Sequence, residues 1–314
     1  FRYAHFDDYF LSTPADDTWT AERDLVPMAN GGGMDDELFV PRVHEAFERA
    51  RTQGKPFFGV VQFNSTHFPY LVKADRENPF GADKLGRYHN AMHLLDGVVV
   101  GLLEWLQARG QLDDTLVILT SDHGESFEEH APHRTQSYYD EVTAIPLFVH
   151  VPSSLLAARP ELIAKLRENQ DRRVQNLDVL PTLLDAIGVL HAPELAPFVE
   201  RFGGQSLFAV VPADRSVLIM NNNAVRRWVN EGFAVANGDQ KYIFSERYGE
   251  GLFDLRRDPG ERRSLWNPRQ RPAWYDRALQ EHPELCALRA RHCKPGNHCQ
   301  PIACASELAS VREE

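Results

Sequence analysis

The sequence predicts an α/β fold, in which a mostly parallel central sheet with helices on both faces is followed by a small antiparallel sheet. Short apolar runs alternate with longer amphipathic segments over 1–204, which is the order of strand–helix–strand units. Over 205–267 the runs shorten and turn residues such as Asn237-Gly238-Asp239 separate them, a pattern typical of hairpins. We therefore expect an α/β core over 1–204, an antiparallel subdomain over 205–267 and a Cys-containing tail over 268–314.

Three segments are predicted to be helices. Residues 34–51 and 84–109 place apolar side chains at helical intervals, and the second segment ends before Gly110, where a helix C-cap glycine belongs. Residues 174–187 form the third helix, with Pro181 near its start.

The predicted core strands are apolar runs of β-forming residues, as expected for strands buried on both faces of a parallel sheet. They are 57–63, 115–120 and 145–151. The predicted strands of the small antiparallel sheet are 216–220, 232–236, 241–244 and 251–255. We expect the charged tail from about residue 268 to wrap the surface.

The charge and composition exclude some classes of protein. The chain has 314 residues and a net charge of -11, so we expect no nucleic-acid partner. No uninterrupted apolar run approaches the roughly 18 residues that span a bilayer. The chain begins at Phe1, as expected of a processed or excised product, and a membrane anchor could precede it. The sequence does not predict an oligomeric state.

The cysteines lie together near the end of the chain. Their spacing, C-x6-C-x5-C-x4-C, lacks the tight C-x2-C pair of common zinc sites. Two disulfides would fit this pattern and an extracytoplasmic, oxidising location, whereas a small metal knot with His292 or His298 is the alternative. The four residues are Cys286, Cys293, Cys299 and Cys304.

The strongest chemical signal is the run 120–125, Thr-Ser-Asp-His-Gly-Glu, directly after a predicted strand. Ligands bind outside the carboxyl ends of strands in open α/β sheets. Asp122 and His123 offer an oxygen and an imidazole nitrogen to one divalent cation. The structural alternative is that Asp122 caps the next helix while His123 is a hydrogen-bonded core histidine.

Two further histidines are candidate catalytic residues. His67 follows the predicted strand 57–63, so we expect it on the same edge of the sheet as Asp122. His133 follows Asp122 by a short loop that also carries His130 and Arg134. Imidazoles there could bind a tetrahedral anion or protonate a leaving group, although turn or solvated-loop roles are the alternatives.

In order and spacing, these segments resemble the sulfatase family of the alkaline-phosphatase-like superfamily. The resemblance runs from about residue 35 to 267, and Ser-Asp-His-Gly-Glu in this context is specific. The matching motifs are 57–58 with His67-Phe68-Pro69-Tyr70, 112–125, Tyr139-Asp140-Glu141 with Ile145-Pro146-Leu147, 177–184, and 252–255 with Asp258-Pro259-Gly260-Glu261.

The resemblance implies a metal-dependent hydrolase or transferase acting on an anionic sulfate or phosphate ester. Asp122 and His123 would be metal ligands, and His67 and His133 would contact the sulfate or phosphate group. The family's nucleophile is a modified Cys or Ser in Cys/Ser-x-Pro-x-Arg, or a Thr in the related transferases. No such Cys or Ser motif occurs in this chain. We therefore expect an N-terminally incomplete chain, a fragment that is inactive alone.

Three functions remain open on this basis. The first is a sulfatase, similar to arylsulfatases and using calcium. The second is a membrane-anchored phosphoethanolamine or phosphoglycerol transferase of the cell envelope that uses zinc or manganese. The third is a noncatalytic sulfatase-like regulatory module, although the retained pair Asp122 and His123 argues against it.

Overall fold

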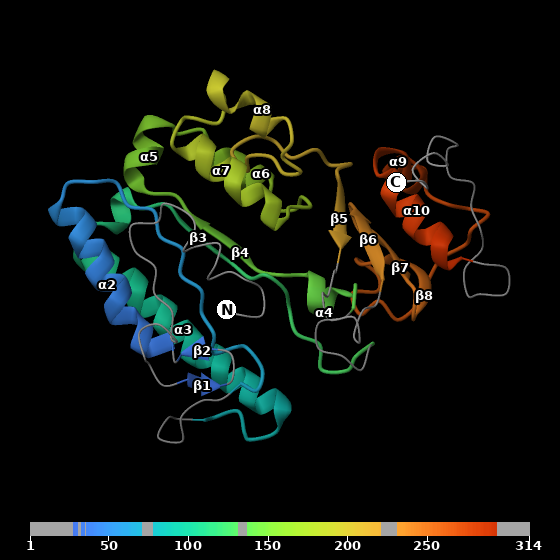
Figure 1. Ribbon diagram of the computed structural model, residues 1–314, viewed down its shortest axis with the longest axis horizontal. Helices are drawn as coiled ribbons and strands as arrows, with labels where there is room; N and C mark the ends of the chain where they lie inside the picture. Colours follow the sequence, from blue (N-terminus) through green and yellow to red (C-terminus); the bar gives the residue numbers. More distant parts are fainter. Residues whose placement is uncertain are drawn as a thin grey trace, which may run out of the picture. The chain divides into compact units, whose positions relative to one another are not determined.

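In the computed structural model of the chain (Figure 1), the described residues are 28–30, 33–34, 36–70, 78–130, 137–220 and 231–293. They belong to two compact units, residues 1–113 and 114–314. The division predicted from the sequence, at residues 204 and 267, stays a prediction.

The first unit contains a short hairpin and two helices. Strands β1 (Met28–Asn30) and β2 (Gly33–Met34) pair antiparallel. Helices α2 (Asp36–Thr52) and α3 (Lys84–Ala108) confirm the two helices predicted in this region. The Asp83 carboxylate caps α3 by accepting the Gly86 N–H at 2.8 Å. Beyond α3, Gly110 has φ +65°, as predicted for a helix-terminating glycine.

Aromatic and charged side chains join α2 to α3. His44 stacks on Trp105 with 4.0 Å between ring centroids, and Phe47 meets Trp105 edge-on at 6.0 Å. The Arg109 guanidinium lies over the Trp105 ring and its Nε is 2.7 Å from Glu48 Oε1. The two helices therefore pack as a pair, with the charged contacts at the rim.

Helix α3 is long and apolar enough, by length and composition alone, to cross a bilayer. Core helices of soluble proteins pass the same test. Its apolar side chains lie on more than one face of the helix, because Ala91, Val98 and Leu106 are buried while Met92 and Val100 are exposed.

The prediction of a strand over 57–63 is wrong. These residues form neither helix nor strand, and Phe57, Phe58 and Val60 are exposed. A strand needs a hydrogen-bonded neighbour, and within the described residues this run pairs with none. An apolar run of this length identifies β-forming residues but not the partner that makes them a strand.

The short helix η1 (Leu112–Asp114) contains the boundary between the two units. The first strands of the second unit are β3 (Val117–Thr120) and β4 (Leu147–His150). Both strands were predicted, but they pair antiparallel, with Thr120 opposite Leu147, whereas a parallel arrangement was expected here. The chain between them carries α4 (Asp140–Thr143) and reverses direction. In the described parts of this connection, 121–130 and 137–146, there is no helical crossover of the kind that parallel pairing requires.

Short helices pack beside this pair of strands. Val149 and Val151 join Leu162, Leu166 and Phe208 in one apolar cluster. The helices are α5 (Ser153–Ala158), α6 (Leu162–Glu168), η2 (Asn176–Asp178), α7 (Val179–Ala186), η3 (Pro193–Leu195) and α8 (Ala196–Val199). Together η2 and α7 confirm the predicted third helix.

The small antiparallel sheet is confirmed. Its four strands lie in chain order, and Gly238, with φ +53°, makes the tight turn between the second and third. Tyr242 and Phe244 on the third strand are fully buried. The strands are β5 (Ser216–Met220), β6 (Gly232–Asn237), β7 (Gln240–Ser245) and β8 (Gly249–Asp254).

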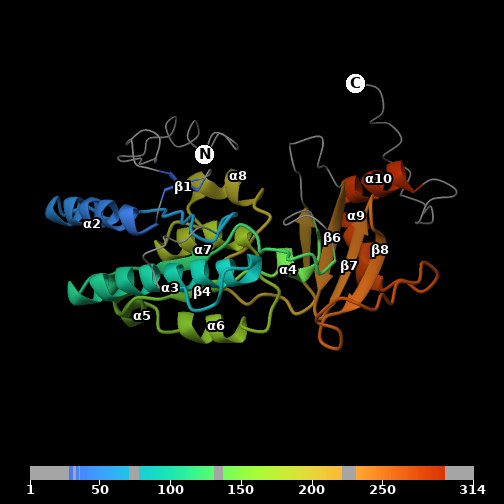
Figure 2. The same ribbon diagram turned by 90° about the horizontal axis from the view of Figure 1, so that it is seen from below.

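Two helices cover one face of this sheet (Figures 1 and 2). Tyr275 of α9 (Ala273–Glu281) and Leu285 of α10 (Pro283–His292) are fully buried in the cluster that contains Tyr242. The tail was predicted to wrap the surface, and α9 and α10 were not predicted within it. Tyr138, ahead of α4, packs with Ala234, Ile243 and Phe253 in a second cluster.

Candidate active site

The Asp-His pair follows the last residue of β3. The β3–β4 ladder ends at Thr120, and the next residue, Ser121, turns its hydroxyl onto the His123 carbonyl at 2.7 Å. The Asp122 carboxylate accepts the His123 backbone N–H at 3.0 Å. These contacts form a tight turn that holds both side chains at the end of the strand.

Asp122 and His123 are placed to share one cation. His123 Nε2 lies 3.6 Å from Asp122 Oδ2, and the two side chains are 38% and 80% exposed. His123 Nδ1 lies 2.6 Å from the Gly124 carbonyl, which can only accept, so Nδ1 carries the proton. Nε2 then keeps its lone pair for a metal, an arrangement common for metal-binding histidines. The alternative role of Asp122 as a helix cap is not observed, because no helix begins directly after it.

Gly124 fixes this turn against α4. Its N–H donates to the Val142 carbonyl at 2.8 Å. A Cβ at Gly124 would come within 2.3 Å of the Glu141 carbonyl oxygen, so this close approach requires glycine. The Asp-His turn and α4 are therefore held in fixed register.

The loop after the pair places His130 next to the start of α4. His130 Nδ1 lies 3.1 Å from both carboxylate oxygens of Glu141, and its ring stacks on Tyr139 at 3.9 Å. His130 is thus held in place, and its contacts favour a structural role. The candidate His133 lies outside the described residues.

His67 belongs to the first unit, on a turn anchored by Asp36. The Asp36 carboxylate is 3% exposed and accepts the N–H groups of Asn64 and Ser65 at 2.7 and 2.8 Å. His67 is exposed, with Nδ1 2.7 Å from the Phe68 carbonyl. That acceptor again places the proton on Nδ1 and leaves the lone pair on Nε2. The predicted proximity of His67 to Asp122 stays a prediction.

A buried ion cluster holds α4 to the small sheet, and sequence reasoning missed it. Lys241 of β7 is 0% exposed, and its Nζ lies 2.5 Å from Asp140 Oδ1 and 2.7 Å from Glu261 Oε1. Glu261 Oε2 also accepts the Asp140 N–H at 2.5 Å. Burial raises the pKa of Glu261, and the attraction of Lys241 opposes that rise. The motif Asp258-Pro259-Gly260-Glu261 was noted in the sequence, but it does not indicate that Glu261 forms an ion pair with Lys241.

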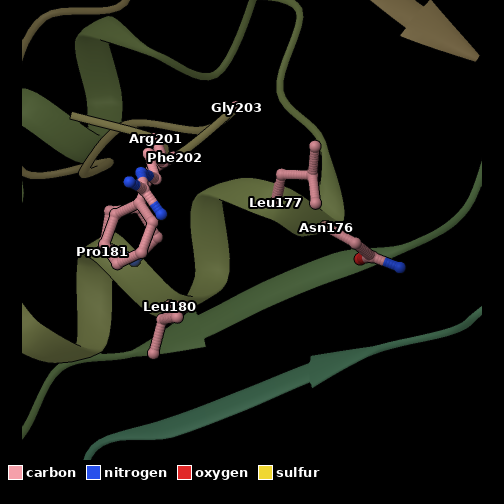
Figure 3. A pocket seen from close by; sticks show the side chains of 7 residues that line it. All are labelled: Asn176, Leu177, Leu180, Pro181, Arg201, Phe202 and Gly203. Atoms are coloured by element: carbon pink, nitrogen blue, oxygen red, sulfur yellow. The ribbon is translucent and has the colours of Figure 1, made fainter. Parts of the chain in front are cut away.

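Two hollows lie in the second unit. One, of about 280 Å³, is lined by Asn176, Leu177, Leu180, Pro181, Arg201, Phe202 and Gly203, with Asn176 at the opposite end from Arg201 and Phe202 (Figure 3). The other, of about 710 Å³, is lined by residues that include Glu129, Glu141, Glu250 and Glu261. Each of these carboxylates already has a hydrogen-bond or ion-pair partner.

No third His, Cys, Asp or Glu joins Asp122 and His123 within the described ranges. Two ligands leave most of a cation's coordination to other donors, since zinc takes four and calcium six to eight. The pair therefore fits part of a metal site, with a nitrogen donor and a carboxylate facing one point.

The fold is shared with solved proteins of the alkaline phosphatase superfamily. A solved protein of that superfamily from Vibrio parahaemolyticus has a TM-score of 0.52 and 17% identity, covering 76% of this chain and 51% of that one. The lipoteichoic acid synthase LtaP from Listeria monocytogenes has a TM-score of 0.50 and 16% identity, covering 79% and 59%. Residues 3–189 match the profile of the family described as Sulfatase. The chain belongs to the sulfatase family.

Among curated proteins, the choline-sulfatase of Rhizobium meliloti (strain 1021) is 29% identical over 184 residues, which are 58% of this chain and 33% of that protein. The chain thus spans about a third of the length of such relatives. The predicted family and its alkaline-phosphatase-like fold are confirmed by these matches.

Proposed function

We propose that this chain is part of a metal-dependent hydrolase of sulfate esters. The observation that carries the proposal is the pair Asp122 and His123, which directs a carboxylate and an unprotonated imidazole nitrogen to one point at the end of β3. Hydrolysis would add one water to the ester and release an alcohol and sulfate.

Asp122 and His123 would hold the divalent cation, which when bound would neutralise charge on the sulfate group and activate the nucleophile. The Gly124 carbonyl would keep the His123 proton on Nδ1. Gly124 and α4 would keep the pair oriented through the Val142 carbonyl. We assign His67 and His133 to contacts with the sulfate group, and one of them to protonation of the leaving oxygen, because the motifs around them resemble those of the family.

The nucleophile is assigned to a residue outside this chain, since neither Cys-x-Pro-x-Arg nor Ser-x-Pro-x-Arg occurs in the 314 residues. In this proposal the chain by itself does not turn over sulfate esters. The extracytoplasmic location and the disulfides in the tail are part of the same proposal. Cys286 and Cys293 are each 4% exposed, and neither is a free thiol.

A phosphoethanolamine or phosphoglycerol transferase is the second candidate. The observation that favours it is the nitrogen donor of His123, because imidazole suits zinc better than calcium, which prefers oxygen ligands. The fold shared with LtaP is compatible with this candidate. Metal preference and substrate then separate the two candidates.

The test uses protein expressed from the complete reading frame. Matched aryl sulfate and aryl phosphate esters are assayed with calcium, zinc or manganese, beside Asp122→Ala and a control, Asp171→Ala, that removes another exposed Asp. We expect metal-dependent sulfate cleavage that Asp122→Ala abolishes and Asp171→Ala retains. Cleavage of neither ester would refute the sulfatase and make a phospholipid headgroup donor the next substrate. Full activity in Asp122→Ala would refute the metal site.

A further inference from the structure

One side chain in the second unit reaches the backbone immediately before the metal pair. Asn176 Nδ2 donates to the Ser121 carbonyl at 2.8 Å, and Asn176 Oδ1 accepts from the Thr120 hydroxyl at 2.8 Å. The Ser121 carbonyl fixes the orientation of this amide, because a flipped amide would set two acceptor oxygens against each other.

These contacts lie just beyond the β3–β4 ladder. The last ladder pair is Thr120 with Leu147, so the Ser121 carbonyl points past the end of strand pairing. The Asn176 amide takes the place that a neighbouring strand would occupy. The peptide linking Ser121 to Asp122 is thereby held by a side chain from another element.

Asn176 lies on η2, a short helix that is held in place by a buried carboxylate. It begins η2, and two residues later the Asp178 carboxylate is fully buried. That carboxylate accepts from the N–H groups of Gln175 and Gln205 at 2.8 Å each and from both terminal nitrogens of Arg215 at 2.8 and 2.9 Å. Four charge-assisted hydrogen bonds hold η2 in place. The position of Asn176 relative to Ser121 is therefore fixed.

We propose that Asn176 is a positioning residue of the metal site: it orients the Ser121–Asp122 peptide and so sets the affinity of the Asp122–His123 pair for a divalent cation. This inference rests on the proposed function, since it requires that the pair bind metal. Groups that orient metal ligands affect metal affinity by about 10- to 100-fold when removed. Asn176 also lines the 280 Å³ hollow, so its substitution leaves the apolar clusters intact.

The experiment measures binding of Mn²⁺ and of Ca²⁺ by calorimetry to protein from the complete reading frame, together with thermal unfolding of the metal-free protein. The variants are Asn176→Ala and Asn176→Asp. The aspartate keeps the acceptor for Thr120 but sets a carboxylate oxygen against the Ser121 carbonyl. Asn237→Ala is the matched control, because the Asn237 amide likewise donates to a carbonyl, that of Asp214 at 2.7 Å, elsewhere in the unit.

We expect both Asn176 variants to bind metal about 10-fold or more weakly, with unfolding temperatures like that of Asn237→Ala. Sulfate-ester turnover should fall with KM little changed, and excess metal should restore part of it. Unchanged metal affinity in Asn176→Ala and Asn176→Asp, beside a wild type that binds, would overturn this inference and leave the proposed function standing. Should Asn176→Ala not fold, the Asn176→Asp affinity decides. No metal binding by the wild type would overturn the proposed function and this inference with it.

Discussion

Substitution of Lys241 by methionine should be strongly destabilising. The side chains have similar length, but methionine removes the positive charge that Asp140 and Glu261 share inside the protein. Lys241 is fully buried and Glu261 is 3% exposed, so water cannot replace the lost partner. Removing one member of a buried ion pair costs about 3–5 kcal/mol, and we expect Lys241→Met to lower the free energy of unfolding by that amount at pH 7.

The penalty should depend on pH, with a defined sign. Burial already raises the pKa of Glu261 above the model-compound value of 4.5, while Lys241 opposes that rise. Without Lys241 the pKa of Glu261 rises further. A carboxyl whose pKa is higher in the folded than in the unfolded protein stabilises the fold below the unfolded value and loses that contribution as pH rises through the folded value. The Lys241→Met penalty should therefore be largest at neutral pH and shrink toward pH 4.5.

Urea unfolding from pH 4.5 to 8, followed by tryptophan fluorescence, measures this effect because Trp266 packs on Tyr242 in the same sheet. Lys165→Met is the matched control: that lysine is partly exposed, with Nζ 3.6 Å from Glu168 Oε2, and its substitution should cost less than about 1 kcal/mol. The double variant Lys241→Met/Glu261→Gln should recover part of the loss. A Lys241→Met penalty no larger than that of Lys165→Met, or one independent of pH, would refute the reasoning.

Three further predictions concern the metal pair and the tail. Asp122→Ala should abolish metal-dependent turnover while shifting the unfolding temperature little, since its side chain is 80% exposed; a large loss of stability by calorimetry would mean a structural role. Gly124→Ala should cost about 1–3 kcal/mol and weaken metal binding, because its Cβ would meet the Glu141 carbonyl oxygen at 2.3 Å; unaltered unfolding and metal titrations would contradict this. Reduction with dithiothreitol should make the segment around Cys286 and Cys293 sensitive to protease while the α/β core stays folded, and an unchanged digestion pattern would argue against disulfides there.

The elements that the sequence predicted correctly are those with local signals. The apolar spacing and Gly110 define α3, and the run before Asp122 defines β3. Turn residues around Gly238 predicted the hairpins of the small sheet. Helix periodicity, caps and turns are each contained in a few neighbouring residues, so one sequence suffices to find them.

The features that were missed depend on partners distant along the chain. An apolar run was enough to nominate 57–63 as a strand, but no neighbour pairs with it among the described residues. The direction of β4 is decided by how the chain between Thr120 and Leu147 returns, which the composition of either strand does not encode. Charged composition obscured α9 and α10, although Tyr275, Ala278 and Leu279 of α9 recur at helical spacing and pack against the sheet.

In the candidate site, the adjacent pair Asp122 and His123 was found because its members are neighbours in sequence. The tautomer of His123 required the observed contact with Gly124. Asn176 and Lys241 were not predicted as supports, since each acts through a residue far away in the chain.

The link between α4 and the small sheet also sets an order of events during synthesis. Asp140 and Glu261 are 121 residues apart, which corresponds to about 6–24 s of translation at roughly 5–20 residues per second. During that interval the Asp-His turn has left the ribosome, but the carboxylate and the lysine that hold its supporting helix have not been made. A nascent chain that stops before Glu261 would expose α4 without its anchor. The support of the Asp-His turn by α4 is thus complete only once Glu261 has been made.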